Sequence, residues 1–294
     1  MRQSSAAIPA LLNPDSGSAT RAREALNTDG RFRVHELKPA QLADAVRAAA
    51  SRGTPRLLVS GGDGTLSAAL GAAAGTALEI AVFPGGTLNH FARDAGIPVN
   101  PTKAAAVVAA GHTRELDVGA MNGQTFVNNL SLGLYPRLVW EREREQLRGR
   151  RKWSAFAVAL VRTWQRYPTM SVSLGVDGVP LQRRTPFVFI GNGEYQAEGL
   201  GLGRRSAIAD GKLSIYLAPG VGQFELLELP IRALAGRLAA DVKFEIFQAC
   251  EVDIESLHPT FGVALDGELK TDVHSPLHCK VLPRALRTLV PEGG

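Results

Sequence analysis

The chain has 294 residues, 45% of them hydrophobic and 21% charged, with a net charge of +5. A chain of this length can bury a substantial core and is long enough for two domains. No apolar run approaches the roughly 20 residues that cross a bilayer, and two cysteines are too few for a disulfide framework or a zinc site. The charge is too small to establish binding to nucleic acid. We therefore expect a globular, cytoplasmic protein without a nucleic-acid partner.

Apolar runs and helix-like stretches alternate in the first part of the chain. We predict strands where apolar residues cluster between glycine or proline, and helices where alanine and leucine recur at helical spacing. In chain order, the predicted elements are a strand at 8–13, a helix at 17–26, a strand at 31–37, a helix at 41–51, a strand at 56–60, a helix at 66–74, a strand at 81–83, a helix that opens at the end of the 84–93 segment, and a helix at 101–110. This alternation is typical of a parallel sheet covered by helices.

Two glycine loops each join a predicted strand to a predicted helix. The loop at 61–65 reads Gly-Gly-Asp-Gly-Thr, and the loop at 84–89 reads Pro-Gly-Gly-Thr-Leu-Asn. Because glycines leave backbone N–H groups unshielded at a helix N-terminus, such loops can bind phosphate. Parallel strands end at one edge of a sheet, so the two loops should lie side by side. For the first loop alone, the alternative is a tight turn that needs glycine for its geometry.

Asp63 places a carboxylate inside the first loop. It would repel a bare phosphate, but it could hold Mg²⁺ against one or accept a proton from a hydroxyl group. The loop matches neither the P-loop nor the dinucleotide-binding fingerprint. A third candidate loop at 13–17, Asn-Pro-Asp-Ser-Gly, adds asparagine and serine as hydrogen-bonding groups. Nucleotide plus metal is the simplest interpretation of the three loops.

The pattern changes after residue 113. Asn122-Gly123 and Asp177-Gly178 are strong signals for hairpin turns, so we expect antiparallel strands on either side of each. Further predicted strands lie at 115–121, 124–130, 169–176, 187–191, 213–217 and 244–254, and helices at about 141–167 and 224–240. Asp266-Gly267 is by itself also only a hairpin signal. The second part of the chain is therefore predicted to be mainly β.

The predicted helix at 141–167 is strongly amphipathic. Its first part alternates Glu and Arg, and its second part places aromatic and apolar residues at helical spacing: Trp153, Phe156, Leu160, Trp164 and Tyr167. Arginines beside an aromatic face can contact a membrane surface. The alternative is a helix packed on the β domain with its charges in water. Both interpretations stay open, and the first would place the protein at the inner face of the membrane.

Taken together, these motifs resemble the diacylglycerol kinase catalytic domain superfamily, which includes bacterial lipid kinases and sphingosine and ceramide kinases. The residues that carry the resemblance are Asn13-Pro14 with Gly17, Gly61-Gly62-Asp63-Gly64-Thr65, Pro84-Gly85-Gly86-Thr87-Leu88-Asn89 with Ala92-Arg93, and Asp266-Gly267-Glu268. Their order and spacing cover nearly the whole chain. The Gly-Gly-Asp-Gly element alone is also similar to NAD kinases and 6-phosphofructokinases.

The resemblance implies a fold of two domains with a cleft between them. Residues 1–114 would form an α/β nucleotide-binding domain with a parallel sheet, similar to NAD kinase and 6-phosphofructokinase. Residues 115–294 would form a mainly antiparallel β domain that binds the acceptor and carries Asp266-Gly267-Glu268. The substrate implied is ATP with Mg²⁺, and the acceptor a lipid at the membrane surface. A homodimer is an open option for the assembly.

The resemblance also implies roles for individual residues. Asp63 would act on the side of Mg²⁺ and ATP, while Glu268 or Asp266 would orient and deprotonate the acceptor; which carboxylate takes the proton stays open. Asp210, in an Asp-Gly-x-Leu segment, would help to bind a structural Mg²⁺, with a plain turn as the alternative. The nucleotide-binding residues would be Asn13, Gly61, Gly62, Gly64, Thr65, Leu66, Ser67, Gly85, Gly86, Thr87 and Asn89.

One departure from the family concerns the acceptor. Arg137 stands in a segment where lipid kinases of this family commonly carry an acidic residue near the acceptor head group. An arginine there suits a negatively charged acceptor better than an amine. Besides a lipid kinase acting on diacylglycerol or another lipid, two alternatives remain. They are a soluble-substrate kinase of the NAD kinase type and a catalytically silent nucleotide-binding module.

Overall fold

The structure is a computed structural model that describes residues 7–86, 88–147, 158, 169–198, 201–205, 208–219, 244–256 and 260–292. Three sequence predictions fall outside these residues: the role of Thr87, the aromatic part of the helix predicted at 141–167, and the helix predicted at 224–240. The chain divides into two compact units. The first is Met1–Val118, Ile208–Asp210 and Leu282–Gly294, and the second is Gly119–Ala207 and Gly211–Val281.

The first unit alternates strands and helices. In chain order it contains β1 (Ile8–Leu12), α1 (Ala19–Thr28), β2 (Phe32–Glu36), α2 (Pro39–Ser51), β3 (Arg56–Gly61), α3 (Asp63–Ala73), β4 (Glu79–Pro84), α4 (His90–Asp94), α5 (Pro101–Ala110), the start of β5 (Thr113–Met121) and the end of β18 (Leu277–Leu289). The strands are ordered β2-β1-β3-β4-β18, and each neighbouring pair is parallel. The predicted parallel sheet is confirmed.

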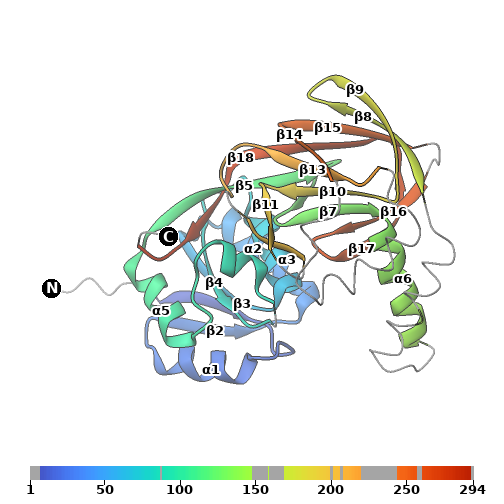
Figure 1. Ribbon diagram of the computed structural model, residues 1–294. Helices are drawn as coiled ribbons and strands as arrows, with labels where there is room; N and C mark the ends of the chain where they lie inside the picture. Colours follow the sequence, from blue (N-terminus) through green and yellow to red (C-terminus); the bar gives the residue numbers. More distant parts are fainter. Residues whose placement is uncertain are drawn as a thin grey trace. The chain divides into compact units, whose positions relative to one another are not determined.

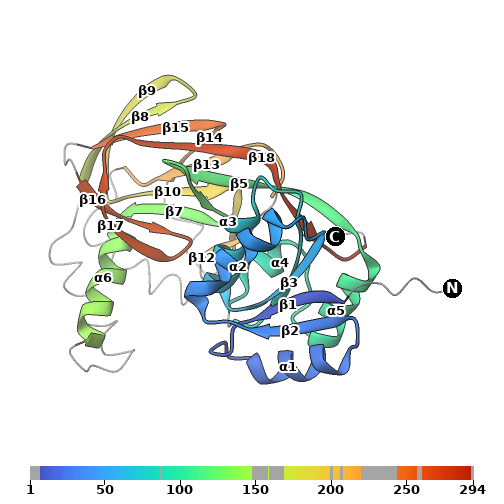
Figure 2. The same cartoon turned by 180° about the vertical axis from the view of Figure 1, so that it is seen from behind.

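Helices cover both faces of this sheet (Figures 1 and 2). Helix α1 packs with α5, and their alanine and leucine side chains meet Leu12, Leu58 and Phe83 of the strands in one apolar core. Helix α2 packs with α3 on the opposite face. Because side chains alternate between the faces of a strand, a strand covered on both faces is apolar throughout. This explains the unbroken run of buried residues in β3.

Two local predictions need correction. Pro9 indicated that the first strand lies at an edge or starts late, but β1 pairs with β2 on one side and β3 on the other. Proline is tolerated because pairing with β3 begins only at Ala10. The helix predicted at 66–74 begins three residues earlier, at Asp63, with Gly62 as its N-cap. The glycine loop is therefore the first turn of α3.

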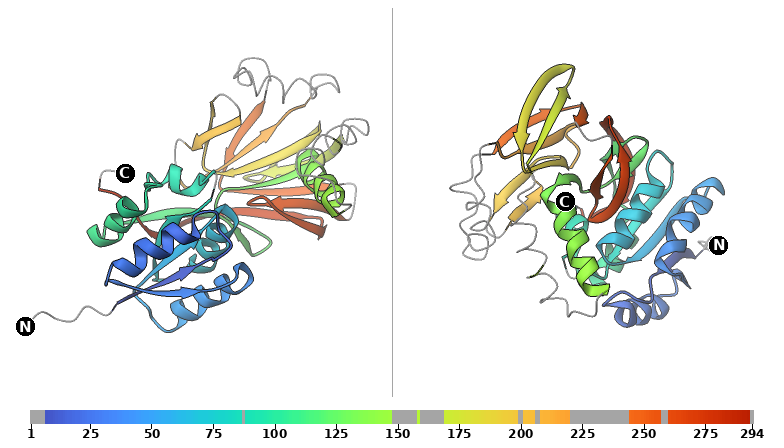
Figure 3. Two further views of the ribbon diagram at one scale, coloured as in Figure 1. Left: turned by 90° about the horizontal axis from the view of Figure 1, so that it is seen from below. Right: turned by 90° about the vertical axis from the view of Figure 1, so that its right-hand side faces the viewer.

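The second unit is built from antiparallel strands. It contains the end of β5, β6 (Gln124–Phe126), β7 (Asn129–Gly133), α6 (Leu134–Leu147), β8 (Met170–Val176), β9 (Val179–Thr185), β10 (Phe187–Asn192), β11 (Tyr195–Glu198), β12 (Gly201–Arg205), β13 (Leu213–Leu217), β14 (Glu245–Ala249), β15 (Glu251–Ser256), β16 (Thr260–Leu265), β17 (Glu268–His274) and the start of β18. One layer is β14-β13-β10-β7-β16-β17, and the other includes β18-β15-β8-β9. An apolar core joins side chains of both layers, and α6 runs beside β7, β16 and β17 (Figure 3).

The predicted hairpins are confirmed, but two predicted strands are interrupted. Both residues of Asn122-Gly123 and Asp177-Gly178 have positive φ, as their turn type requires. The strand predicted at 124–130 divides into β6 and β7, and the strand predicted at 244–254 divides at Cys250 into β14 and β15, which belong to different layers. The Asp177 carboxylate accepts the N–H groups of Cys250 and Glu251 at this point.

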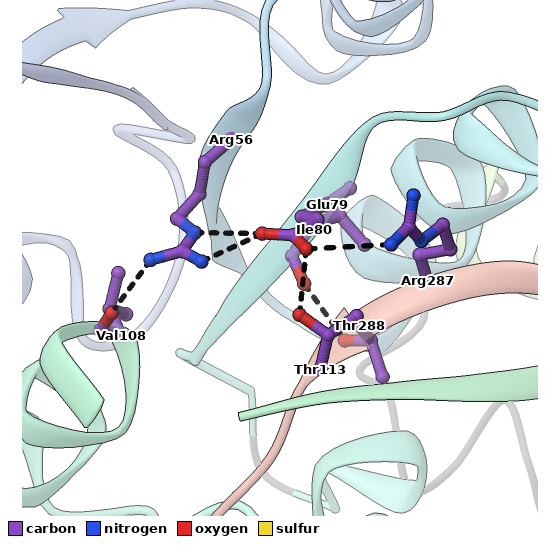
Figure 4. A network of polar contacts seen from close by, with 7 residues as sticks. All are labelled: Arg56, Glu79, Ile80, Val108, Thr113, Arg287 and Thr288. Carbon is purple, nitrogen blue, oxygen red and sulfur yellow. Dashed lines mark hydrogen bonds and ion pairs between the residues drawn. The ribbon is translucent and has the colours of Figure 1, made fainter. Parts of the chain in front are cut away.

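A polar network ties four strands of the first unit together (Figure 4). The Glu79 carboxylate accepts hydrogen bonds from Arg56 Nη2 at 2.7 Å and from Thr113 Oγ1 at 2.8 Å, and Arg287 Nη2 lies 3.7 Å from it. Burial acts to raise the pKa of Glu79, but the hydrogen bonds from Arg56 and Thr113 outweigh it, and the pKa lies below its ordinary value of 4.5. The ionised carboxylate therefore stabilises the fold.

Glu79→Gln should cost about 2 kcal/mol of unfolding free energy at pH 7, as expected for hydrogen bonds to a charged group. Because the folded pKa is depressed, this contribution is complete above pH 4.5 and is lost as the pH falls through the folded pKa. Urea denaturation at pH 7 and at pH 3 should show the difference between wild type and variant shrinking in acid. A difference that is equal at both pH values would contradict this assignment.

Candidate functional site

The two glycine loops lie side by side at the carboxyl edge of the first unit's sheet, as predicted. Gly61 of β3 is paired with Pro84 of β4, and Gly85 N–H donates to Gly61 O at 2.7 Å. A Cβ atom placed on Gly86 would lie 3.0 Å from the Cα of Gly62. Glycine is therefore needed here for close approach, not for a left-handed backbone, because none of these loop glycines has a positive φ.

Asp63 holds the second loop in place. Its two carboxylate oxygens accept the N–H groups of Asn89 at 2.9 Å and His90 at 2.7 Å, at the start of α4. The Asn89 side chain in turn accepts from Gly86 N–H and donates to Gly86 O, both at 2.9 Å. A carboxylate on backbone donors at a helix N-terminus is a cap. Asp63 thus has a structural role that its sequence position did not reveal.

The third predicted loop joins the same site. Asn13, which is buried, donates from Nδ2 to Thr65 Oγ1 at 2.9 Å and accepts Asp15 N–H on Oδ1 at 3.0 Å. These bonds attach the loop after β1 to the first turn of α3. All three loops predicted from the sequence therefore meet at one edge of the sheet.

A cavity of about 500 Å³ opens between these loops. Its wall is formed by Asn13, Asp15, Ser16, Gly17, Ser18, Arg21, Gly62, Asp63, Gly64, Thr65, Gly85 and Gly86. The Oγ atoms of Ser16 and Ser18 are buried and have no hydrogen-bond partner among the described residues. Such hydroxyl groups, an arginine and the first-turn N–H groups of α3 are suited to phosphate oxygens.

The predicted nucleotide-binding residues fall into three groups according to their position relative to this cavity. Asn13, Gly62, Gly64, Thr65, Gly85 and Gly86 line it. Gly61 and Asn89 are not in its wall but accept hydrogen bonds from Gly85 and Gly86, which are. Leu66 and Ser67 are buried in α3 and are also absent from its wall. The N–H groups of Gly85 and Gly86 already bond within the protein, so these glycines shape the cavity and do not donate to a ligand. The sequence indicated Ser16 as a hydrogen-bonding group of the third loop, whereas Ser18 and Arg21 were missed, although they follow that loop within a few residues.

Gly64 and Gly61 offer a matched test of why glycine occurs here. A Cβ atom on Gly64 would meet no protein atom within 4 Å, whereas a Cβ atom on Gly61 would lie 2.4 Å from Thr65 Cγ2. Gly64→Ala should therefore leave the melting temperature unchanged or slightly raised, because alanine favours helix, and should weaken ATP binding about tenfold if phosphate approaches there. Gly61→Ala should cost roughly 1–3 kcal/mol by overpacking. Calorimetric unfolding and ATP titration would measure both, and unchanged ATP affinity in Gly64→Ala would contradict the phosphate site.

Asp266 is anchored inside the second unit. Its carboxylate accepts three backbone N–H groups, from Val127 at 2.8 Å, Asn128 at 2.7 Å and Asn129 at 3.0 Å. Val127 and Asn128 form the interruption between β6 and β7, and Asn129 begins β7. Burial raises the pKa of Asp266, while the three N–H groups and Arg205 act to lower it. Asp266 also has a positive φ and begins the turn from β16 to β17, so the predicted hairpin exists and its first residue holds a neighbouring segment.

Glu268 differs from Asp266 in its surroundings. It is the first residue of β17, its side chain is 60% exposed, and its ionic contact is with Lys270 Nζ at 3.3 Å. An exposed carboxylate next to an anchored turn is free to contact a substrate. The predicted meeting of Glu268 with the glycine loops stays a prediction.

Asp210, the predicted ligand of a structural Mg²⁺, lies at an exposed bend of the first unit. Within the parts of the chain that the structure describes, no group of three or more His, Cys, Asp or Glu side chains could hold a metal ion. A structural Mg²⁺ at Asp210 would depend on backbone carbonyl groups and stays a prediction.

Comparison with known proteins agrees with this architecture. The chain matches the model described as "Diacylglycerol kinase catalytic domain" over residues 8–121, and the model described as "YegS C-terminal NAD kinase beta sandwich-like domain" over residues 139–290. A diacylglycerol kinase of Mycobacterium tuberculosis is 27% identical, with 98% of this chain and 96% of the relative covered. A Pseudomonas fluorescens protein named "Probable lipid kinase YegS-like" is 32% identical, with 96% and 92% covered.

Solved structures show the same fold. A diacylglycerol kinase from Bacillus anthracis superposes with a TM-score of 0.70 at 20% identity, covering 97% of both chains. Yeast NADH kinase, solved with NADH, superposes with a TM-score of 0.55 at 11% identity, covering 98% of this chain and 85% of its own.

An α/β unit with paired glycine loops and a β-sandwich unit of the NAD kinase type together define a class of kinases, and this chain is a member of that class. Within it, the chain belongs to the family of diacylglycerol kinases and YegS-like lipid kinases. The family resemblance and the fold class predicted from the sequence are both confirmed.

Proposed function

We propose that this kinase transfers the γ-phosphoryl group of ATP to a hydroxyl group of a membrane lipid. The observation that carries the proposal is an apolar cavity within the second unit, whose wall includes Leu269, the residue after Glu268. A lipid chain held there would have its head group near the strand that begins with the exposed carboxylate. The cavity among the glycine loops supports the phosphate-binding half of the reaction.

The apolar cavity has a volume of about 550 Å³, within the range of roughly 300–1,000 Å³ that is usual for small-ligand pockets. Its wall combines Leu132, Gly133, Pro136, Arg137, Trp140, Thr169, Met170, Val172, Ile254, Ser256, Phe261, Gly262, Leu269, Thr271 and Asp272. The aliphatic and aromatic members suit a hydrocarbon chain, and the few polar members suit a head group. Such a cavity favours a lipid acceptor over a wholly polar one.

On the donor side, the residues present fit a nucleotide with its metal. The first-turn N–H groups of α3, the two serine hydroxyl groups and Arg21 would bind phosphate oxygens. The Asp63 carboxylate lines the same cavity, and one carboxylate plus phosphate oxygens is a common ligand set for Mg²⁺. Bound Mg²⁺ would neutralise negative charge on the phosphates during transfer.

On the acceptor side, the two carboxylates divide the work. Asp266 already accepts three backbone N–H groups, so we assign it to holding the turn. Glu268 is exposed, and its ionic contact is with the exposed Lys270, so we assign it to orienting the acceptor hydroxyl and taking its proton. Among the alternatives that the sequence left open, we therefore propose Glu268 as the group that takes the proton.

Charged side chains in the wall of the apolar cavity indicate which kind of lipid head group would bind there. Arg137 is exposed and lies on α6, one helical turn before Trp140, and both line the cavity. Asp272 contributes a negative charge to the same wall. An anionic group would pair with Arg137. The proposed acceptor is accordingly a lipid that carries a hydroxyl group beside an anionic group, with neutral diacylglycerol as the comparison.

Transfer of label from γ-³²P-ATP tests the proposal. Diacylglycerol, phosphatidylglycerol and NAD would each be supplied with Mg²⁺, and the products separated by extraction into chloroform. Label in the organic phase supports a lipid kinase, and a preference for phosphatidylglycerol supports the role of Arg137. Aqueous labelled product made from NAD would select a soluble-substrate kinase, which the likeness to yeast NADH kinase keeps as the second candidate. If no labelled product forms, the remaining candidate is a catalytically silent nucleotide-binding module.

Access to a lipid requires contact with a membrane. Among the described helices, none has the length and apolar character to cross one. We propose peripheral attachment at the inner face, and sedimentation with anionic vesicles would detect it. A homodimer remains a proposal that equilibrium ultracentrifugation would decide.

A further inference from the structure

A buried arginine lies behind the Asp266 turn. Arg205 ends β12 and is 6% exposed. Its Nη1 donates to Val127 O at 2.7 Å and to Asn192 O at 3.1 Å, and its Nη2 donates to Asn128 Oδ1 at 3.3 Å. The guanidinium also lies over the ring of Tyr195, with Cζ 5.9 Å from the ring centre. Burying an arginine is costly unless its donors are paired, so its position is set by these acceptors.

Arg205, a cation, and Asp266, an anion, both form hydrogen bonds to the short segment Val127–Asn129. The peptide group between Val127 and Asn128 presents its carbonyl oxygen to Arg205 and its N–H group to Asp266. The N–H groups of Val127 and Asn129 complete the bonding to the carboxylate. A cation on the oxygen and an anion on the hydrogen polarise that peptide group in the same direction, so each bond strengthens the other.

Two neighbouring side chains add further hydrogen bonds to the Val127–Asn129 segment. Asn192 Nδ2 donates to Val127 O at 3.0 Å, and Tyr195 Oη donates to Asn128 O at 3.0 Å. The segment between β6 and β7 is thus fixed by side chains of three other strands. Because Asp266 is bonded to this segment, the place of the segment sets the place of the turn. Glu268 follows Asp266 by two residues, across Gly267 at a φ of 84°.

We propose that Arg205 is a positioning residue, which fixes the Asp266–Glu268 turn through the Val127–Asn129 segment and so sets where the Glu268 carboxylate stands. Its catalytic consequence rests on the lipid kinase activity proposed above. The sequence around Arg205 does not indicate this role, since Val127 and Asn128 lie 78 and 77 residues earlier in the chain. Displacement of a reacting group by about 1 Å can cost on the order of 100-fold in rate.

Three variants of the full chain test this role. Arg205→Met removes the charge and the donors while keeping length, and Arg205→Lys restores the charge. Arg56→Met is the control, because Arg56 is another arginine whose guanidinium bonds within the protein, to Glu79 and to Val108 O, but it lies in the first unit. We expect Arg205→Met to lower kcat for lipid phosphorylation roughly 10- to 100-fold with the KM for ATP within about twofold, and Arg205→Lys to recover part of the loss. Arg56→Met should lower the melting temperature without this loss of kcat.

Hydrogen exchange gives a readout that does not require activity. The amides of 127–129 and the 266–268 turn should exchange faster in Arg205→Met and stay unchanged in Arg56→Met, at a temperature where both remain folded. Unchanged exchange there, or a loss of kcat that is equal in Arg56→Met, would overturn the proposal. If the wild type phosphorylates no acceptor, the proposed function fails, while exchange still decides whether Arg205 holds the turn. If Arg205→Met does not fold, exchange and kcat of Arg205→Lys decide in its place.

Discussion

Glu268→Gln should lower kcat for phosphoryl transfer by about 10²- to 10⁴-fold, the usual contribution of a general base. Glutamine keeps the size and the hydrogen-bonding oxygen of the side chain but cannot accept the proton of the acceptor hydroxyl. The fold should not suffer, because Glu268 is 60% exposed and its ionic contact is with Lys270 at 3.3 Å. Exposed ion pairs contribute little to stability. Initial-rate measurements with labelled ATP would give kcat and KM.

Glu251→Gln is the control for this change. Glu251 is an exposed glutamate of the same unit, at the start of β15 and outside both cavities. Its substitution should leave kcat unchanged. Asp266→Asn should behave differently again, because it weakens bonds to three backbone N–H groups and so lowers the melting temperature as well as the rate. Full activity in Glu268→Gln would remove Glu268 from the mechanism.

Asp63→Ala should abolish phosphoryl transfer and also destabilise the first unit. The carboxylate caps α4 through Asn89 and His90, and losing such a cap costs about 0.5–2 kcal/mol. Without it, the second glycine loop loses the two side-chain bonds that attach its end to the first loop, which leaves the backbone pairing of Gly61 with Pro84 and Gly85 to shape the cavity between them. The sequence placed Asp63 on the side of the metal and nucleotide, and the structure adds its role as the cap of α4.

Asp63→Asn separates the two roles. Asparagine keeps one oxygen for a backbone N–H group but removes the charge that would bind Mg²⁺. Its melting temperature should lie between those of wild type and Asp63→Ala, while its activity should be as low as that of Asp63→Ala. Asp44→Ala, at an exposed ion pair on α2, is the control for loss of a surface carboxylate. Activity in Asp63→Asn near that of wild type would limit Asp63 to a structural role.

The sequence predicted those parts of the fold and site that depend on local patterns. The strand ends and glycine loops of the first unit follow from runs of apolar residues that stop at glycine. The hairpins at Asn122-Gly123, Asp177-Gly178 and Asp266-Gly267 follow from residues that tolerate a positive φ. These signals lie within a few neighbouring residues, so no knowledge of distant partners is needed to find them.

Contacts between distant segments could not be predicted in this way. The interruption at 127–128 arises because Asp266, far along the chain, binds the N–H groups there in place of a strand partner. The position of Asp63 in the sequence indicates a carboxylate in a phosphate loop, but its bonds to Asn89 and His90 depend on how two loops meet. The last strand, β18, begins in the second unit and ends in the first beside β4, which no local pattern indicates.

The central claim is that an anion site among the glycine loops and the carboxylate of Glu268 serve one phosphoryl transfer to a lipid. A crystal structure with a non-hydrolysable ATP analogue, Mg²⁺ and a hydroxyl-bearing lipid tests it most directly. We predict phosphates against the first turn of α3 beside Gly64, a lipid chain against Met170 and Leu269, and the lipid hydroxyl within hydrogen-bond distance of Glu268. Phosphates bound away from α3, or a hydroxyl group held by a residue other than Glu268, would contradict the claim.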